Sequence, residues 1–459
     1  MGVARRTVLT GAGALFLLGR NLSVPALAQA TARPPAAGSA DIPPILFVHG
    51  NGDHAALWLT TLWRMESNGV PRERMAAINF TDPLARADDK VEQAGRSSTE
   101  DQRRELNDAV KELKQKTGAA RIALVGNSRG GNAIRNYVKN GGSADISHAV
   151  LCGTPNHGVY ASDDGLGNEF NGRGPFLRGL NDGDSEVTVG TAFLTLRSDG
   201  LDKYAQADGR FVGKPGTPTN VTAEGPALKG ATNLVLGAVD HRETAYHPRA
   251  FREIYKFIAG HEPSRIEIAP ETAVRLSGLV TGTPGGVPTN RPVPGATVDI
   301  YHVSAETGER IGGPLLSSQT GADGRWGPAQ VDPSWPLEFV LTSPGAVTTH
   351  IYRSPFPRSS EIVHLRAARP PGPADSGAGA IVLMSRPRGY FGLPRDIVLF
   401  DGKEPADVKS GVPTDAVTTL RFAAAEIGRP VAAIFNGERI VMRPWPASEN
   451  RIAVAELTY

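Results

Sequence analysis

Short apolar segments alternate with amphipathic segments across the first half of the sequence. The apolar segments have the length of strands and lie at residues 45–48, 121–126, 148–155, 192–198 and 233–239. Helical spacing of apolar side chains is found instead at residues 98–118, 131–140 and 248–260. Strands that alternate with helices predict a mostly parallel sheet covered by helices on both faces. We therefore expect an α/β catalytic domain over residues 42–265.

A serine stands at the junction between one of these strands and the helix that follows it. Gly126-Asn127-Ser128-Arg129-Gly130 has the Gly-x-Ser-x-Gly pattern. Flanking glycines permit a turn sharp enough to raise the Ser128 hydroxyl above the strand ends, where a base can activate it. A turn needed only for packing would show the same five residues. The position between strand and helix favours a nucleophile, and we predict that role for Ser128.

A serine nucleophile needs hydrogen-bond donors for the oxyanion that develops during attack. The backbone N–H of Arg129 directly follows Ser128 and is one candidate. The second is the N–H of Asn51, in the loop HGNG (49–52) after the first strand. Glycines in that loop suit a backbone that turns toward a substrate, and His49 is expected to be structural there.

The base is expected after the last strand, because the triad of this fold runs Ser, Asp, His in sequence order. His241 and His247 both follow that strand. His241 is separated from it by one residue, which puts the imidazole at the C-terminal end of the sheet. His247 precedes Pro248 and suits a surface or capping position at the closing helix. We therefore predict that His241 is the base.

Two aspartates follow the strand at 192–198, and either can supply the acid. Asp199 lies at the strand end, whereas Asp202 lies a few residues beyond it. A triad aspartate normally needs the longer reach to contact the imidazole. Spacing alone favours Asp202 but leaves both residues open.

Four short segments together resemble lipases of the α/β-hydrolase superfamily. They are VHGNG, GNSRGG, DKYAQ and VDH, and the resemblance extends over roughly residues 42–260. The similarity is to small class 2 bacterial lipases and some fungal lipases, where the aspartate of Asp-x-x-x-Gln is catalytic. It implies that Asp202 is the acid and that Gln206 completes the motif. The sequence departs at Asn127 and Arg129, where class 2 lipases usually carry His and Met. Acyl-chain preference stays open there, because the residue beside the nucleophile is expected to line the pocket.

The N-terminus has the features of an export signal. Adjacent arginines at 5 and 6, a short apolar run and small residues near Ala28 predict a signal peptide over 1–28. The paired arginines resemble the twin-arginine type, and an ordinary secretory signal is the alternative. A Pro/Ala linker over 29–41 follows. We expect an exported protein, periplasmic or extracellular, without a transmembrane span, since no later run has 18 apolar residues.

Beyond about residue 265, strand-like runs and Pro/Gly turns replace the helical spacing. Residues 271–366 resemble a small transthyretin-like β-sandwich, and residues 381–459 predict a further β-rich domain after a Pro/Gly/Ala stretch at 367–380. The layout resembles an archaeal lipase with a β-rich C-terminal part. No catalytic cluster stands out in this half, so we assign it to surface binding or stabilisation. Residues 159–190, within the first half, form a long connection that is either a lid or a surface loop.

These features predict a secreted serine carboxylester hydrolase, a lipase or esterase that acts on lipidic esters. The alternatives are an extracellular polyester depolymerase of the polyhydroxyalkanoate type and a surface-binding protein with an inactive hydrolase fold. The only cysteine, Cys152, excludes an intramolecular disulfide and a multi-cysteine metal site. We expect no metal and no cofactor. A net charge of +2 with scattered basic residues gives no reason to expect nucleic acid as a partner.

Overall fold

The computed structural model describes residues 42–459. The predicted signal peptide (1–28) and linker (29–41) lie outside the described residues. No helix in the described range is long and apolar enough to cross a membrane.

A six-stranded parallel sheet forms the centre of the first half, in the order β2-β1-β5-β6-β7-β8. Its strands are β1 (Ile45–Val48), β2 (Met75–Ala77), β5 (Ile122–Asn127), β6 (Ile146–Cys152), β7 (Ala192–Ser198) and β8 (Thr232–Leu236). Because every pair is parallel, all the carboxyl ends of the strands lie at one edge, where loops carry Ser128, Asp202 and His241. The predicted α/β fold is confirmed.

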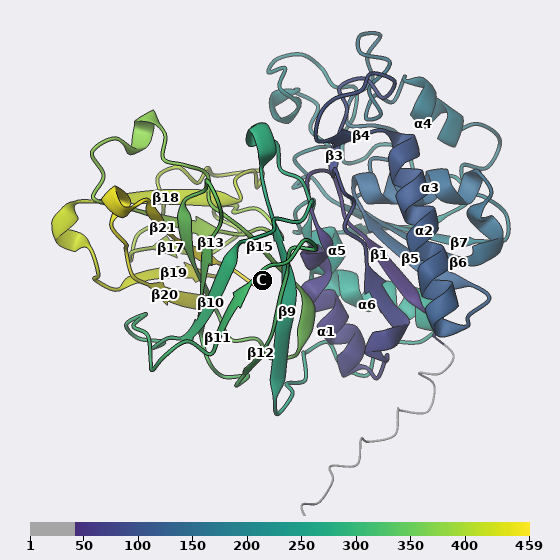
Figure 1. Ribbon diagram of the computed structural model, residues 1–459. Coiled ribbons are helices and arrows are strands. Elements are labelled where there is room, and N and C mark those ends of the chain that lie inside the picture. The colour runs from purple at the N-terminus through teal and green to yellow at the C-terminus, as the bar shows by residue number, and fades with distance from the viewer. Residues whose placement is uncertain (1–41) are drawn as a thin grey trace, which may run out of the picture. The chain divides into compact units, whose positions relative to one another are not determined.

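Helices cover both faces of this sheet (Figure 1). On one face lie α1 (Leu59–Ser67), α5 (Glu243–Tyr246) and α6 (Pro248–Ala259), and on the other lie α2 (Thr99–Thr117) and α3 (Arg129–Lys139). Strand β1 contributes to both cores, since Phe47 packs with the first group and Leu46 with the second. The ends of α2 agree with the sequence: Ser98 caps its first turn, and Gly118 ends it at a φ of 68°.

Short elements lie beside the carboxyl edge of the sheet. They are β3 (Leu84–Ala85), β4 (Arg96–Ser97) and α4 (Pro175–Leu180). Strands β3 and β4 pair with each other in a two-stranded sheet.

The second half is built from β-strands, as expected. They are β9 (Val274–Thr281), β10 (Thr297–His302), β11 (Leu316–Gln319), β12 (Arg325–Val331), β13 (Leu337–Thr342), β14 (Thr348–Arg353), β15 (Ser360–Arg366), β16 (Ala380–Ser385), β17 (Val398–Phe400), β18 (Val417–Phe422), β19 (Val431–Phe435), β20 (Glu438–Met442) and β21 (Arg451–Glu456). One seven-stranded sheet has the order β11-β10-β13-β14-β21-β16-β18, and two three-stranded sheets are β12-β9-β15 and β17-β19-β20. Strand β21 pairs in parallel with both β14 and β16. Strands from the 271–366 and 381–459 regions therefore share one sheet.

Helix α1 joins the two halves through a common apolar core. Its residues Leu59 and Trp63 pack in one cluster with side chains of the β-rich half, including Phe356. The indole N–H of Trp63 also donates a hydrogen bond to the Ser359 carbonyl at 3.0 Å. Because α1 packs apolar side chains against both the α/β sheet and the β-rich half, it holds the two together.

The glycines of the Gly-x-Ser-x-Gly turn lie where α3 crosses close to the sheet. A Cβ atom added at Gly130 would lie 2.4 Å from the His49 carbonyl oxygen, which is backbone and cannot move aside cheaply. A Cβ added at Gly126 would lie 2.6 Å from the Ile134 side chain. The pattern is therefore required by packing as well as by the sharpness of the turn.

We predict that Gly130→Ala lowers the free energy of unfolding by about 1–3 kcal/mol, because the new methyl group pushes α3 away from β1. Gly179→Ala is the matched control. Gly179 lies in α4 with open space around the added Cβ, so its replacement is expected to be neutral or stabilising by about 0.5–1 kcal/mol. Urea unfolding of both variants measures the difference, and equal stabilities would contradict the close approach.

Candidate active site

Ser128 occupies a strained turn between β5 and α3. Its backbone has φ 54° and ψ −123°, a conformation that costs a non-glycine residue of order 1–3 kcal/mol. The turn is held by a hydrogen bond from the Ser128 N–H to the Cys152 carbonyl at the end of β6, at 2.9 Å. The strain is thus maintained by the neighbouring strand, as in a turn that exposes a nucleophile.

His241 and Asp202 form a buried pair across two loops. Nδ1 of His241 lies 2.8 Å from Oδ2 of Asp202, and the two residues are 3% and 7% exposed. The carboxylate can only accept, so Nδ1 carries the proton and Nε2 is left as the acceptor. Nε2 is buried and makes no hydrogen bond with any of residues 42–459. The Tyr204 ring packs edge-on against the imidazole, with the centroids 4.7 Å apart.

The competing candidates bond elsewhere. Asp199 accepts hydrogen bonds from the backbone N–H groups of Leu201 at 3.1 Å and Ala238 at 2.7 Å, as expected for a residue that holds its own turn. His247 caps α6, where its side chain accepts from the Arg249 N–H at 3.2 Å. The expectation of a capping position for His247 is confirmed.

Ser128, His241 and Asn51 line a cavity of about 250 Å³. Apolar and aromatic side chains form much of its lining: Val159, Tyr160, Phe170, Tyr204, Phe211, Val212 and Tyr390. A neighbouring cavity of about 290 Å³ shares Tyr204 and His241 but not Ser128. We take the first as the candidate reaction site because its lining includes Ser128, His241 and Asn51, which belongs to the loop expected to bind an oxyanion.

The loop that carries Asn51 is fixed by side-chain hydrogen bonds. Nε2 of His49 accepts from the Phe80 N–H at 3.1 Å, so Nδ1 carries the proton and donates to the Gly50 carbonyl at 2.9 Å. The side-chain oxygen of Asn51 accepts from the Ala85 N–H at 2.7 Å. Burial lowers the pKa of His49 to about 4, so the ring is neutral at neutral pH.

The side chain of Arg129 points away from the cavity, contrary to the expectation for the residue beside the nucleophile. It is fully buried and forms two hydrogen bonds to the Glu169 carboxylate, at 2.7 and 2.6 Å. It also donates to the Ser97 hydroxyl at 2.9 Å and to the Pro83 carbonyl at 3.1 Å. A guanidinium has several donors in a fixed plane, so this side chain ties together three segments around the turn. Only its backbone N–H remains a candidate oxyanion donor.

Asn127, directly before Ser128, does line the cavity. Its amide Nδ2 donates to the Cys152 carbonyl at 3.0 Å and lies 3.4 Å from the His241 carbonyl. It connects the Ser128 turn with the loop that carries His241. The Gly-x-Ser-x-Gly pattern gave no signal for this role, since its second position is variable.

The first part of the 159–190 segment lines the same cavity. Val159, Tyr160, Asn168 and Phe170 contribute to the lining, and Glu169 between them pairs with Arg129. The Arg129–Glu169 pair therefore attaches the segment to the nucleophile turn. Sequence reasoning did not identify Glu169, because its partner lies forty positions earlier in the chain.

Two family models match the chain. The model of palmitoyl protein thioesterase matches residues 44–182, and the model of the lipase C-terminal domain matches residues 272–370. Together they support the resemblance to α/β-hydrolases of the lipase and esterase type that the sequence motifs indicated. A comparison with curated proteins found no significant match.

Several solved structures align with about half of this chain. Lipase B of Aspergillus fumigatus shares 12% identity and a TM-score of 0.35, over 51% of this chain and 56% of that one. A mature lipase of Bacillus licheniformis shares 19% identity and a TM-score of 0.35, over 50% and 96%. The monoacylglycerol lipase of Paleococcus ferrophilus shares 11% identity and a TM-score of 0.32, over 48% and 96%.

The buried neutral ring of His49 predicts a pH-dependent contribution to stability. Its pKa in the folded chain, about 4, is lower than the ordinary value of 6.5. As the pH falls from 6.5 to 4, the unfolded chain takes up a proton at this residue and the folded chain does not, so the free energy of unfolding decreases. The full effect is about 3 kcal/mol.

We expect His49→Gln, which keeps an acceptor near the position of Nε2, to lose this part of the pH dependence. Denaturant unfolding of both proteins at pH 7.5 and pH 4 measures it, and the contributions of other histidines cancel in the comparison. A stability difference between the two proteins that is the same at both pH values would contradict a buried neutral His49.

Proposed function

We propose that this chain is an exported serine carboxylester hydrolase that cleaves lipidic esters through Ser128, His241 and Asp202. The observation that carries the proposal is the 2.8 Å contact between His241 Nδ1 and Asp202 Oδ2, made beside a cavity that also contains Ser128. The support for a hydrolase of the lipase and esterase type comes from the family models.

In the proposed reaction, the Ser128 hydroxyl attacks the ester carbonyl carbon while His241 Nε2 takes its proton. Asp202 keeps the other ring nitrogen protonated and stabilises the imidazolium that forms. The backbone N–H groups of Asn51 and Arg129 donate to the oxyanion. His241 then protonates the departing alcohol, and water releases the acyl group from Ser128 by the same steps.

The cavity lining favours an uncharged ester with an apolar chain. Aromatic side chains surround the reacting groups, and the nearby Arg242 guanidinium is engaged with the Pro387 carbonyl at 2.8 Å and with Asp53 at 3.6 Å. We further propose that residues 159–190 cover this cavity when substrate binds. A fatty-acyl thioester is a second substrate type to test, since the matching family model is that of a thioesterase.

We predict that Ser128→Ala reduces ester turnover by about 10⁶-fold without loss of the fold, because the nucleophile is removed. Turnover of p-nitrophenyl butyrate, emulsified triolein, palmitoyl-CoA and a polyhydroxybutyrate film is measured in parallel. Ser185 is exposed and lies outside the cavity, so Ser185→Ala serves as the control. Retention of a tenth of the wild-type rate by Ser128→Ala would exclude it as the nucleophile, and preferential film cleavage would favour the polyester depolymerase.

Replacement of Asp202 and of Asp199 is predicted to affect different properties, namely turnover for the first and stability for the second. Asp202→Asn should lower kcat by about 10⁴-fold, because the imidazole loses the charge that orients it. Asp199→Asn should cost about 1 kcal/mol of stability and little activity, because Asp199 bonds to the turn amides of Leu201 and Ala238 and to the Ser198 hydroxyl, away from His241. Kinetics on one soluble ester and thermal unfolding of each variant decide this. An inactive Asp199→Asn beside a normal Asp202→Asn would reverse the assignment.

A further inference from the structure

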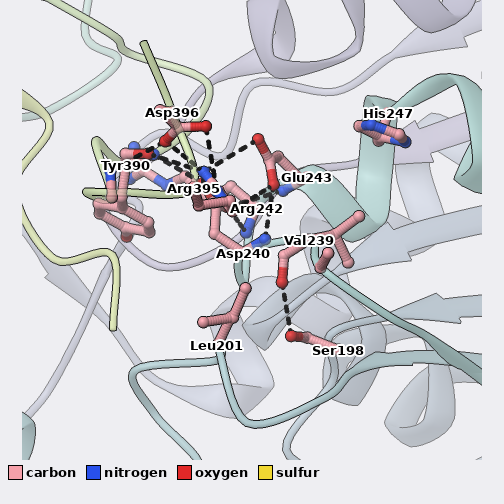
Figure 2. Close-up of polar contacts among 12 residues, drawn as sticks. Ser198, Leu201, Val239, Asp240, Arg242, Glu243, His247, Tyr390, Arg395 and Asp396 are labelled. Carbon is pink, nitrogen blue, oxygen red and sulfur yellow. Dashed lines mark hydrogen bonds and ion pairs between the residues drawn. The ribbon is translucent and has the colours of Figure 1, made fainter. Parts of the chain in front are cut away.

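The loop that carries His241 is held by buried side chains from the β-rich half of the chain (Figure 2). Asp240, directly before His241, accepts a hydrogen bond from Arg386 Nη1 at 2.9 Å and from the Tyr390 N–H at 2.8 Å. Glu243 contacts Arg386 at 2.5 Å and Arg395 at 2.8 Å. Asp240 is fully buried. Both acidic neighbours of His241 therefore bond to the segment 386–396, which connects β16 and β17.

The loop that carries Asp202 reaches the same region. Lys203, the next residue after Asp202, donates to the Thr414 carbonyl at 3.1 Å. Its ammonium group also lies 3.8 Å from the centroid of the Tyr390 ring, a cation–π contact. Tyr390 of the β-rich half thus contacts both Lys203, the neighbour of Asp202, and Asp240, the neighbour of His241.

Tyr390 also forms part of the cavity that contains Ser128. It is 5% exposed, and among the described residues that line this cavity it alone comes from beyond residue 265. Its backbone is fixed on both sides, because its N–H donates to Asp240 and its carbonyl accepts from Arg386 at 2.6 Å. The Arg242 guanidinium lies 5.3 Å from the centroid of its ring. A ring anchored in this way forms a rigid wall.

We propose that Tyr390 is a specificity-determining residue of the active site, which bounds the space for the apolar chain of the substrate. The inference rests on the proposed ester hydrolysis and adds to it that the β-rich half builds part of the reaction site. An aromatic ring presents an apolar face to a substrate chain. Arg386, Arg395 and Asp396 of the segment 386–396 are engaged in ion pairs with one another or with Asp240 and Glu243. Arg388 donates to the Leu457 and Thr458 carbonyls. The wall therefore selects by shape and apolar contact.

The test is the selectivity of Tyr390→Ala toward two ester series. One series varies the acyl chain of p-nitrophenyl esters from acetate to laurate, and the other varies the alcohol of butyrate esters from methyl to naphthyl. We expect the kcat/KM ratio of bulky to small members to change by about 10-fold or more in at least one series. Tyr390→Phe keeps the ring and should retain the wild-type ratio.

Tyr301→Ala is the matched control. Tyr301 is a half-buried tyrosine of β10 outside the cavity, and the Arg310 guanidinium carbon lies 3.8 Å from the centroid of its ring. This variant should leave both series unchanged. Unchanged ratios in both series for Tyr390→Ala, in a protein that still hydrolyses the esters, overturn the inference. Failure of the proposed function is a different result, namely a folded wild-type protein that cleaves no member of either series.

Discussion

The close approach of α3 to the C-terminal end of β1 is the constraint on which the rest of the site depends. Gly130 lies against the His49 carbonyl, and a Cβ atom on Gly50 would lie 2.9 Å from the Cβ of Ser128. The serine turn and the loop that carries Asn51 are therefore in direct contact through positions that only glycine can fill. This contact brings the strained Ser128 turn and the loop of Asn51 together before any polar side chain is considered.

Buried ion pairs then hold the other parts of the site in place, namely the 159–190 segment and the β-rich half. Arg129 and Glu169 attach the 159–190 segment, and Asp240 and Glu243 attach the β-rich half. Burial and the nearby Asp240 carboxylate raise the pKa of Glu243, whereas Arg386 and Arg395 act in the opposite direction and favour its charged form. Buried ion pairs contribute little net stability because desolvation is costly. Their value here is geometric, since each pair defines one relative position of two segments.

The sequence was sufficient for the parts of the structure that rest on local patterns. Apolar strands, the caps of α2 and the serine turn all have short-range signals, and the structure contains them. Helix α1 was not predicted, although Leu59, Leu62 and Trp63 follow helical spacing. All of residues Leu59–Met65 are buried, and Thr60, Thr61 and Arg64 are polar side chains among them. Glu169 and Tyr390 could not be found for a different reason: each acquires its position from a partner far away in the sequence. The hydrogen bond between Asp202 and His241 agrees with the expected pairing, while their catalytic roles remain predictions.

Strand β21 gives the molecule an order of assembly. It lies between β14 and β16 in the seven-stranded sheet, and it follows every other described strand in the sequence. The ribosome therefore synthesises β14 and β16 before β21, the strand that pairs with both. Until β21 is in place, the strands β11-β10-β13-β14 and the pair β16-β18 are not joined in one sheet. In the segment 386–396, which begins directly after β16, Arg386 donates to the Tyr459 carbonyl and Arg388 donates to the Leu457 and Thr458 carbonyls, so these bonds need the residues that follow β21. A chain interrupted before residue 451 would contain Ser128, Asp202 and His241, yet the sheet that supports one wall of their cavity would be incomplete.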